Sequence, residues 1–228
     1  MKKRPFTLVE MILVVAVIAI LIALLLPSVK TVRDKGKQVT CMSNLRNMGQ
    51  ALVLYVADND RFVTFSNWQS LDAHYEKGWL YAKAQRSLAE HVENGAFWNY
   101  LYERDIYHCP MHRDHETAGG TRRLTSYLMT GMMQHYSVNE LFRYSDFPGD
   151  GFMIWEANTL GGSWNDGANF NTQASPQLSY RHFERANVLS FSGGVESLFS
   201  VEFDAERDTA TTQDQTRLFY CPRKDGKH

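Results

Sequence analysis

The chain has 228 residues, with 24 lysines and arginines against 25 aspartates and glutamates, so its formal net charge at pH 7 is −1. This balance provides no broad positive field, which argues against nucleic acid as a partner. Aromatic residues make up 13% of the chain, which supplies side chains for a well-packed core.

The first predicted element is a helix that begins near Phe6 and continues through an unbroken apolar run from Met11 to Leu26. At ~1.5 Å per residue, Phe6 to Leu26 spans about 31 Å, which matches the hydrocarbon core of a bilayer. The segment before it, residues 2–4, is Lys-Lys-Arg, and a basic flank stays on the cytoplasmic side. We therefore expect one membrane-spanning segment with a cytoplasmic N-terminus and an exported body.

Two simpler interpretations of this segment are a cleaved signal peptide and a plain membrane anchor. A signal peptide ends in a small-residue cleavage site, whereas the apolar run here is followed by Pro27-Ser28-Val29-Lys30. A plain anchor gives no reason for Glu10, a carboxylate near the cytoplasmic end of the segment. Because a charged group inside a bilayer costs free energy, an acidic residue there indicates a function.

The order Arg4-Pro5-Phe6-Thr7-Leu8-Val9-Glu10 resembles the N-terminal signature of type IV pilins and type II secretion pseudopilins. The resemblance implies that a prepilin peptidase cleaves before Phe6 and that the new terminus is N-methylated. It also implies that Glu10 pairs with the terminal amine of a neighbouring subunit in a filament. Pro5 departs from the family pattern, which usually has glycine before the cut. Proline fixes its own φ and lacks an N–H, so a groove built for glycine fits it poorly.

The same resemblance implies where the chain resides and what it contacts. We expect a single-pass protein of the inner membrane whose head lies in the periplasm or outside the cell, and which can move into a filament. The implied partners are other pilin-like subunits, the prepilin peptidase, the inner-membrane assembly machinery and the lipid bilayer. The expected function is that of a structural subunit of a secretion pseudopilus or a pilus-like filament. The alternative is a monomeric anchored module whose head binds a polymer or carbohydrate.

From Ser28 to about Asn59 apolar residues recur every three or four positions, which predicts an amphipathic continuation of the helix. Pro27 and Gly36 are the positions where we expect a break or a bend. The stripe consists of Val29, Val32, Val39, Met42, Leu45, Met48, Leu52 and Tyr55.

Strand signals lie further along the chain. Phe152–Glu156 is a short apolar run after turn-forming residues, which predicts a buried strand. Ala186–Phe191 and Val195–Phe203 are predicted as two strands of a hairpin joined by Ser192-Gly193-Gly194. Residues 126–133 fit either a strand or a short helix, and the polar stretch 159–176 predicts an exposed loop.

These elements predict an α+β fold, with a long N-terminal helix packed on a mainly antiparallel sheet. We expect four parts: a basic leader (1–5), a transmembrane and assembly helix (6–27), its amphipathic continuation (28–59) and a globular head (60–228). Several short landmarks are similar, in their order, to a large pseudopilin-like group of planctomycete- and lentisphaera-type bacteria. They are Asn44-Leu45-Arg46, Tyr107-His108-Cys109-Pro110, Ser126-Tyr127, Trp155-Glu156, Arg181-His182 and residues 186–196. The hairpin turn of that group commonly reads Asp-Gly-His, whereas this chain has Ser192-Gly193-Gly194. If the Asp and His side chains bind a ligand in that group, this chain lacks that binding site.

Three cysteines, Cys41, Cys109 and Cys221, allow one disulfide with one thiol left over. An exported domain favours a disulfide, with Cys41–Cys109 or Cys109–Cys221 as the pairings. The alternatives are free thiols or a zinc site built from Cys109, Cys221 and two histidines of the 108–115 segment.

Calcium at acidic loops such as the one around Asp150 has no D-x-D-x-D-G motif to support it. No catalytic motif such as G-x-S-x-G or H-E-x-x-H is present, so we expect no catalytic residues. The spacing of the histidines and cysteines fits no standard zinc finger, so we also expect no resident metal and no other cofactor.

Overall fold

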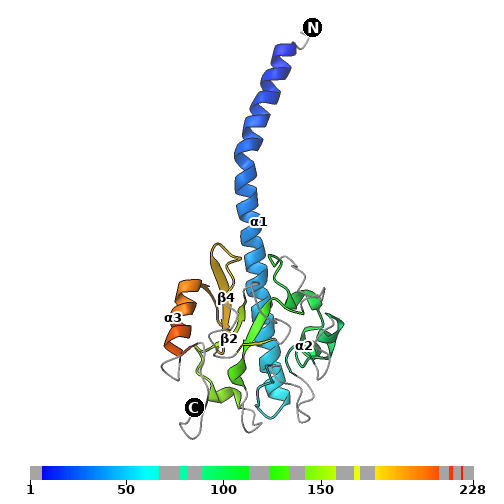
Figure 1. The fold of residues 1–228 in the computed structure, drawn as a ribbon. Coiled ribbons are helices and arrows are strands. Elements are labelled where there is room, and N and C mark those ends of the chain that lie inside the picture. The colour runs from blue at the N-terminus through cyan, green and yellow to red at the C-terminus, as the bar shows by residue number, and fades with distance from the viewer. Residues whose placement is uncertain are drawn as a thin grey trace.

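One long helix, α1 (Leu8–Asp58), projects from a head that is built around its second half (Figure 1). The computed structural model describes residues 7–66, 78–81, 89–112, 124–133, 142–157, 167–169, 178–210, 216–217 and 222. Pro5, Phe6 and Cys221 lie outside these ranges. Among the described residues, α1 is the one helix long and apolar enough to cross a membrane, and the head covers none of its apolar part.

The helix is continuous through Pro27 and Gly36, where the sequence predicted a break or a bend. Pro27 cannot donate the N–H that would reach the Ala23 carbonyl, yet the helix continues with a smooth curvature (Figure 1). At the next turn the Thr31 hydroxyl donates a hydrogen bond of 3.2 Å to the Pro27 carbonyl oxygen. The transmembrane and amphipathic parts therefore form a single helix.

The predicted amphipathic stripe is half right. Leu45, Met48 and Leu52 are fully buried against the head, as the periodicity indicated. Val29 and Val39 are more than half exposed, because burial of α1 by the head begins only at Cys41. The side chain of Asn44 marks this boundary, since its amide donates to the carbonyl oxygens of Asp105 (3.3 Å) and His108 (3.1 Å).

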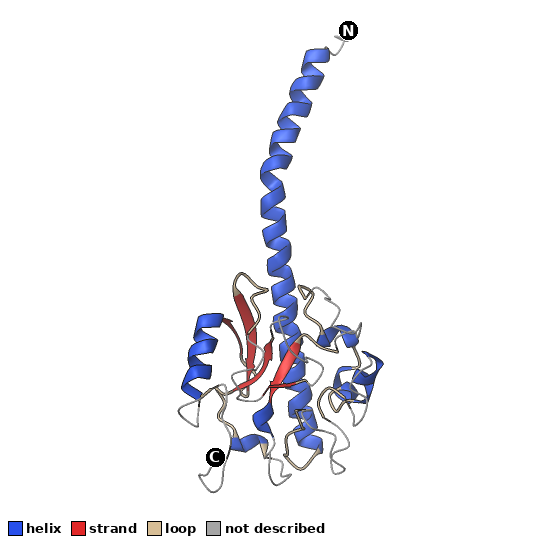
Figure 2. Ribbon diagram, viewed as in Figure 1, coloured by secondary structure: helices blue, strands red, loops and turns tan. Residues whose placement is uncertain are grey.

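The head contains a five-stranded sheet in the order β3-β1-β2-β4-β5 (Figure 2). The pairs β1–β2, β2–β4 and β4–β5 are antiparallel, and β3 runs parallel to β1. The mainly antiparallel α+β fold is thus confirmed. The strands are β1 (Tyr127–Thr130), β2 (Phe152–Glu156), β3 (Ala168–Asn169), β4 (Arg185–Ser190) and β5 (Val195–Phe199).

Short helices complete the described part of the head. They are η1 (Ala89–Asn94), α2 (Trp98–Leu101), η2 (Arg104–Tyr107), η3 (Gly131–Met133), η4 (Tyr144–Asp146) and α3 (Ser200–Ala210). The apolar segment 126–133 is therefore both a strand and a short 3-10 turn. Most of the predicted loop 159–176 lies outside the described residues, but its residues 168–169 form strand β3.

The predicted strand Val195–Phe203 is wrong in its second half, because the chain turns into helix α3 at Ser200. The Glu202 carboxylate accepts a hydrogen bond of 2.8 Å from the backbone N–H of Phe199, which satisfies one of the free donors at the helix start. Helical geometry then turns Phe203 inward against Trp155, with ring centroids 5.7 Å apart. Val201, which a strand would place on the same face as Phe203, is instead 75% exposed.

Both faces of the sheet are covered, which explains why β2 reads as an unbroken apolar run. One core, between the sheet and α1, contains Leu45, Met48, Tyr127, Ile154 and Leu189 among others. A smaller core on the opposite face contains Trp155, Phe152, Val188 and Phe203, the last of which comes from α3. All five residues of β2 are buried.

Two glycines make a matched test of this packing. A Cβ at Gly95 would lie 2.6 Å from the backbone carbonyl of Leu80, whereas one at Gly36 would meet nothing within 4 Å. We expect Gly95→Ala to lower the free energy of unfolding by about 1–3 kcal/mol through overpacking. Gly36→Ala should raise it by up to about 1 kcal/mol through helix propensity. Urea titration of the detergent-solubilised chain measures both, and equal stability of Gly95→Ala and wild type would contradict this packing.

Candidate functional site

The start of α1 is built as a capping box. Thr7 is the N-cap residue, and its hydroxyl accepts a hydrogen bond of 3.3 Å from the backbone N–H of Glu10. The Glu10 carboxylate in turn accepts from the backbone N–H and from the hydroxyl of Thr7, both at 2.8 Å. These contacts satisfy donors that a helix start otherwise leaves free. The described geometry therefore gives Glu10 a local partner within its own chain.

The surface that follows Glu10 is apolar and uncovered. Every large apolar side chain from Leu8 to Leu26 is about half exposed or more. No charged residue occurs between Glu10 and Lys30. An apolar surface of this extent requires lipid or other apolar helices around it. The predicted processing residues Pro5 and Phe6 lie directly before the capping box, outside the described residues.

A second cluster lies where α1 enters the head. Cys41 on α1 and Cys109 after η2 are both buried, with their sulfur atoms 2.6 Å apart. Both are thiols in the structure. Of the two predicted pairings, the structure brings Cys41 and Cys109 together, and Cys221 lies outside the described residues. The hydrogen bond from the Cys41 thiol, with a further one from His182, lowers the pKa of Cys109 despite its burial. The same contact with Cys109, together with burial, raises the pKa of Cys41.

His182 and Glu156 complete this cluster, and neither residue has any exposed surface. The Nε2 atom of His182 lies 2.9 Å from the Glu156 Oε1 atom and 3.4 Å from the Cys109 sulfur. Burial opposes the charged imidazole, but the hydrogen bonds to Cys109 and Glu156 outweigh it and raise the pKa of His182 to about 9. Glu156 also accepts from the backbone N–H (2.9 Å) and the side-chain amide (3.2 Å) of Asn187.

The chain positions His182 with a tight two-residue turn. His182 and Arg185 exchange two backbone hydrogen bonds of 3.1 Å, and the residues between them, Phe183 and Glu184, have φ angles of 54° and 66°. Left-handed backbone is unfavourable for residues of these types. Strain of this kind persists only where the surroundings enforce it, and it is common at functional positions.

Sequence reasoning offered Cys41–Cys109 as one of two disulfide pairings, and it noted Glu156 and His182 only as landmarks without a role. The sequence did contain a signal for a functional role of Glu156, because this carboxylate ends a run that is otherwise apolar and was predicted to be a buried strand. The landmark Ser126 also gains a role, since its hydroxyl accepts from the backbone N–H of Cys109 at 2.9 Å.

The zinc set predicted from the 108–115 segment is not assembled within the described residues. The ring of His112 lies 2.7 Å from the Ser126 hydroxyl, while Cys109 groups with Cys41, Glu156 and His182. His115 and Cys221, which the prediction also used, lie outside the described residues.

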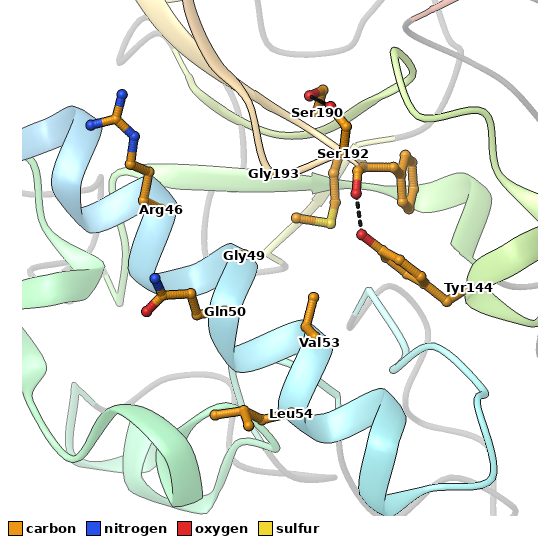
Figure 3. Close-up of a pocket in the computed structure, with 11 residues that line it drawn as sticks. Arg46, Gly49, Gln50, Val53, Leu54, Tyr144, Ser190, Ser192 and Gly193 are labelled. Atoms are coloured by element: carbon orange, nitrogen blue, oxygen red, sulfur yellow. Dashed lines mark hydrogen bonds between the residues drawn. The ribbon is translucent and has the colours of Figure 1, made fainter.

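A pocket of about 440 Å³ lies between α1 and the β4–β5 hairpin turn (Figure 3). Arg46, Gln50 and Val53 of α1 line one side, and Tyr144 and residues 190–193 line the other. The Tyr144 hydroxyl donates to the carbonyl oxygen of Phe191, which fixes the ring at the pocket wall. The turn that borders the pocket is the one that reads Ser-Gly-Gly in this chain.

Comparison with known proteins gives one match. Residues 1–26 match the family model described as the prokaryotic N-terminal methylation motif. No curated protein and no solved structure matches the chain. The matched residues contain the basic leader, the capping box with Glu10 and the apolar run, and the single apolar helix is compatible with a single-pass membrane anchor.

Proposed function

We propose that this chain, whose first 26 residues carry the methylation motif of type IV pilin-like precursors, is a structural subunit of a filament. The filament is a type II secretion pseudopilus or a type IV pilus-like fibre. The observation that carries the proposal is the placement of this motif at the head of an apolar helical segment that the rest of the chain leaves uncovered.

The helix serves two environments in succession. In the membrane, lipid covers the apolar surface from Leu8 to Leu26. In the filament, the same surface packs against like helices from other subunits, because small and apolar residues allow close helix contact. The prepilin peptidase and the inner-membrane assembly machinery act between these two states. The N-terminus is cytoplasmic, and the head is exported.

Glu10 gives the assembly its register. In the isolated chain its carboxylate is partnered by Thr7. An unpaired carboxylate is costly in an apolar bundle, so a neighbour's new terminal amine, which carries a positive charge, stabilises one relative position of two subunits over others. This interaction accounts for an acidic residue in a segment that must first enter lipid.

A second candidate function is a monomeric anchored module that binds a polymer or carbohydrate. The pocket beside α1 favours it, because Arg46, Gln50 and Ser192 place polar groups around an apolar wall. In that case the stem is an anchor and needs no processing. We propose no catalytic role for either form.

N-terminal mass spectrometry of the mature chain tests the proposal. We expect the chain purified from its native membrane to begin with N-methyl-phenylalanine at position 6, because the motif directs cleavage before that residue. Pro5→Gly should speed or complete the processing, since glycine restores the flexibility and the N–H that proline lacks. An intact Met1 start in wild type, unchanged in Pro5→Gly, would favour the anchored module.

A further inference from the structure

Four metal-ligating side chains meet inside the head, each supplied by a different segment. Cys41 comes from α1, Cys109 from the loop after η2, Glu156 from the end of β2 and His182 from the turn before β4. One donor atom of each lies within 4.8 Å of the donor atoms of the others. None of the four side chains is more than 1% exposed. The fold therefore gathers two thiols, a carboxylate and an imidazole at one enclosed point.

The spacing of these donors suits a small tetrahedral cation. With ligand bonds of ~2.0–2.3 Å, neighbouring donors of a tetrahedral zinc ion are roughly 3.3–3.8 Å apart. The separations of 3.4 Å between Cys109 and His182 and 2.9 Å between His182 and Glu156 are close to this range. The two sulfurs, at 2.6 Å, need to separate by about 1 Å, which a rotation of either cysteine side chain provides.

The surroundings hold the donors in place, as metal ligands require. Asn187 fixes the Glu156 carboxylate through its backbone N–H and its amide, and Ser126 holds the backbone of Cys109. The Nδ1 atom of His182 is buried without a hydrogen-bond partner among the described residues. Nε2 is the nitrogen that faces the other donors, since it lies 2.9 Å from Glu156 Oε1 and 3.4 Å from the Cys109 sulfur.

The donor types also suit a divalent cation. Two sulfur atoms, a carboxylate and an imidazole lie together in a buried site, and buried charged groups are stable when they are paired, as Glu156 is with His182, or when they coordinate a metal. Thiolate, imidazole and carboxylate together form a donor set that zinc accepts. We propose that Cys41, Cys109, Glu156 and His182 bind one zinc-class divalent ion when both cysteines are thiols.

Zinc binding would link α1 to the sheet, and formation of a Cys41–Cys109 disulfide would compete with it. Zinc displaces the thiol protons and the proton on Nε2 of the His182 imidazolium; all of them leave to solvent, and no electrons are transferred. Formation of a Cys41–Cys109 disulfide instead removes two protons and two electrons, which a thiol–disulfide oxidoreductase of the exported compartment accepts. The disulfide sulfurs are no longer thiolate ligands, so oxidation expels the ion. This proposal is independent of the filament role.

Metal analysis of the full chain in detergent, purified with reductant and without chelator, tests the site. We expect about one zinc per chain in wild type and in Cys221→Ser, which removes a thiol outside the set. Cys109→Ser and His182→Asn should each bind zinc at least tenfold more weakly. Zinc well below one per chain in reduced wild type, or undiminished binding in Cys109→Ser, would overturn the proposal.

Cobalt substitution of the wild-type chain makes the test independent of variants that fail to fold. We expect the visible bands of tetrahedral cobalt together with thiolate-to-cobalt charge transfer. Oxidation with diamide should abolish the spectrum, and reductant should restore it. An octahedral spectrum without charge transfer, or one that survives oxidation, would show that the ion is bound elsewhere and would overturn the assignment.

Discussion

Glu10→Leu is expected to leave the chain in the membrane and to reduce its incorporation into filaments at least tenfold. Leucine makes the helical segment more apolar, and a charged residue at the bilayer centre costs roughly 2.5–3.5 kcal/mol on insertion scales, so membrane insertion does not suffer. In the proposed filament, assembly would lose the carboxylate that we propose pairs with a neighbour's terminal amine. Quantitative immunoblots of the membrane fraction and of the sheared filament fraction measure the two effects separately.

Thr7→Val serves as the control for Glu10→Leu. It removes the hydroxyl that caps α1 and keeps the carboxylate, so it costs about 0.5–2 kcal/mol of helix stability. We expect near-normal assembly in this variant, because the Glu10 charge remains. Wild-type incorporation of Glu10→Leu would contradict the filament role, and an equal loss in Thr7→Val would assign the defect to capping.

Leu45→Ala is expected to lower the free energy of unfolding of the full chain by about 2–5 kcal/mol, as cavity-forming substitutions in a core do. Leu45 is fully buried between α1 and the sheet. Its counterpart on the same predicted stripe, Val29, is 61% exposed, and Val29→Ala should change stability by no more than about 0.5 kcal/mol.

Urea denaturation of both variants in detergent micelles, followed by tryptophan fluorescence, measures this difference. The head contains the buried Trp79 and Trp155, whose emission reports loss of the core. A large effect of Val29→Ala would mean that the head covers α1 further toward the membrane than its described residues do. A small effect of Leu45→Ala would contradict the docking of α1 on the sheet.

The sequence predicted correctly those helices and strands whose pattern of apolar residues is the same along their whole length. The apolar run of α1 and the strand Phe152–Glu156 were predicted from sequence alone, because each follows one pattern from end to end. The boundary at Ser200 was missed because Val201 and Phe203 fit the period of two that predicts a strand. In helix α3 the two side chains separate, with Val201 exposed and Phe203 packed against Trp155.

The buried cluster shows a different limit. Cys41–Cys109 was one of two disulfide pairings predicted for an exported domain, but Glu156 and His182 belong to common residue types with no distinctive spacing. Their meeting depends on the register that places β2 beside β4 and on the turn that carries His182. Such long-range placement is a property of the folded chain, and no window of the sequence contains it.

The continuity of α1 through Pro27 and Gly36 would fix the distance between the bilayer and the head of the proposed membrane-anchored chain. The residues from Leu26 to Cys41 rise about 22 Å as helix; within this stretch the side-chain amide of Gln38 donates to the Ser197 hydroxyl of β5 at 3.2 Å, and full burial of α1 begins at Cys41. A hinge at either position would let the head swing on a flexible tether. As a continuous rod, the stem converts any rotation of its membrane end into an equal rotation of the head, so the head's orientation is set where the helices pack.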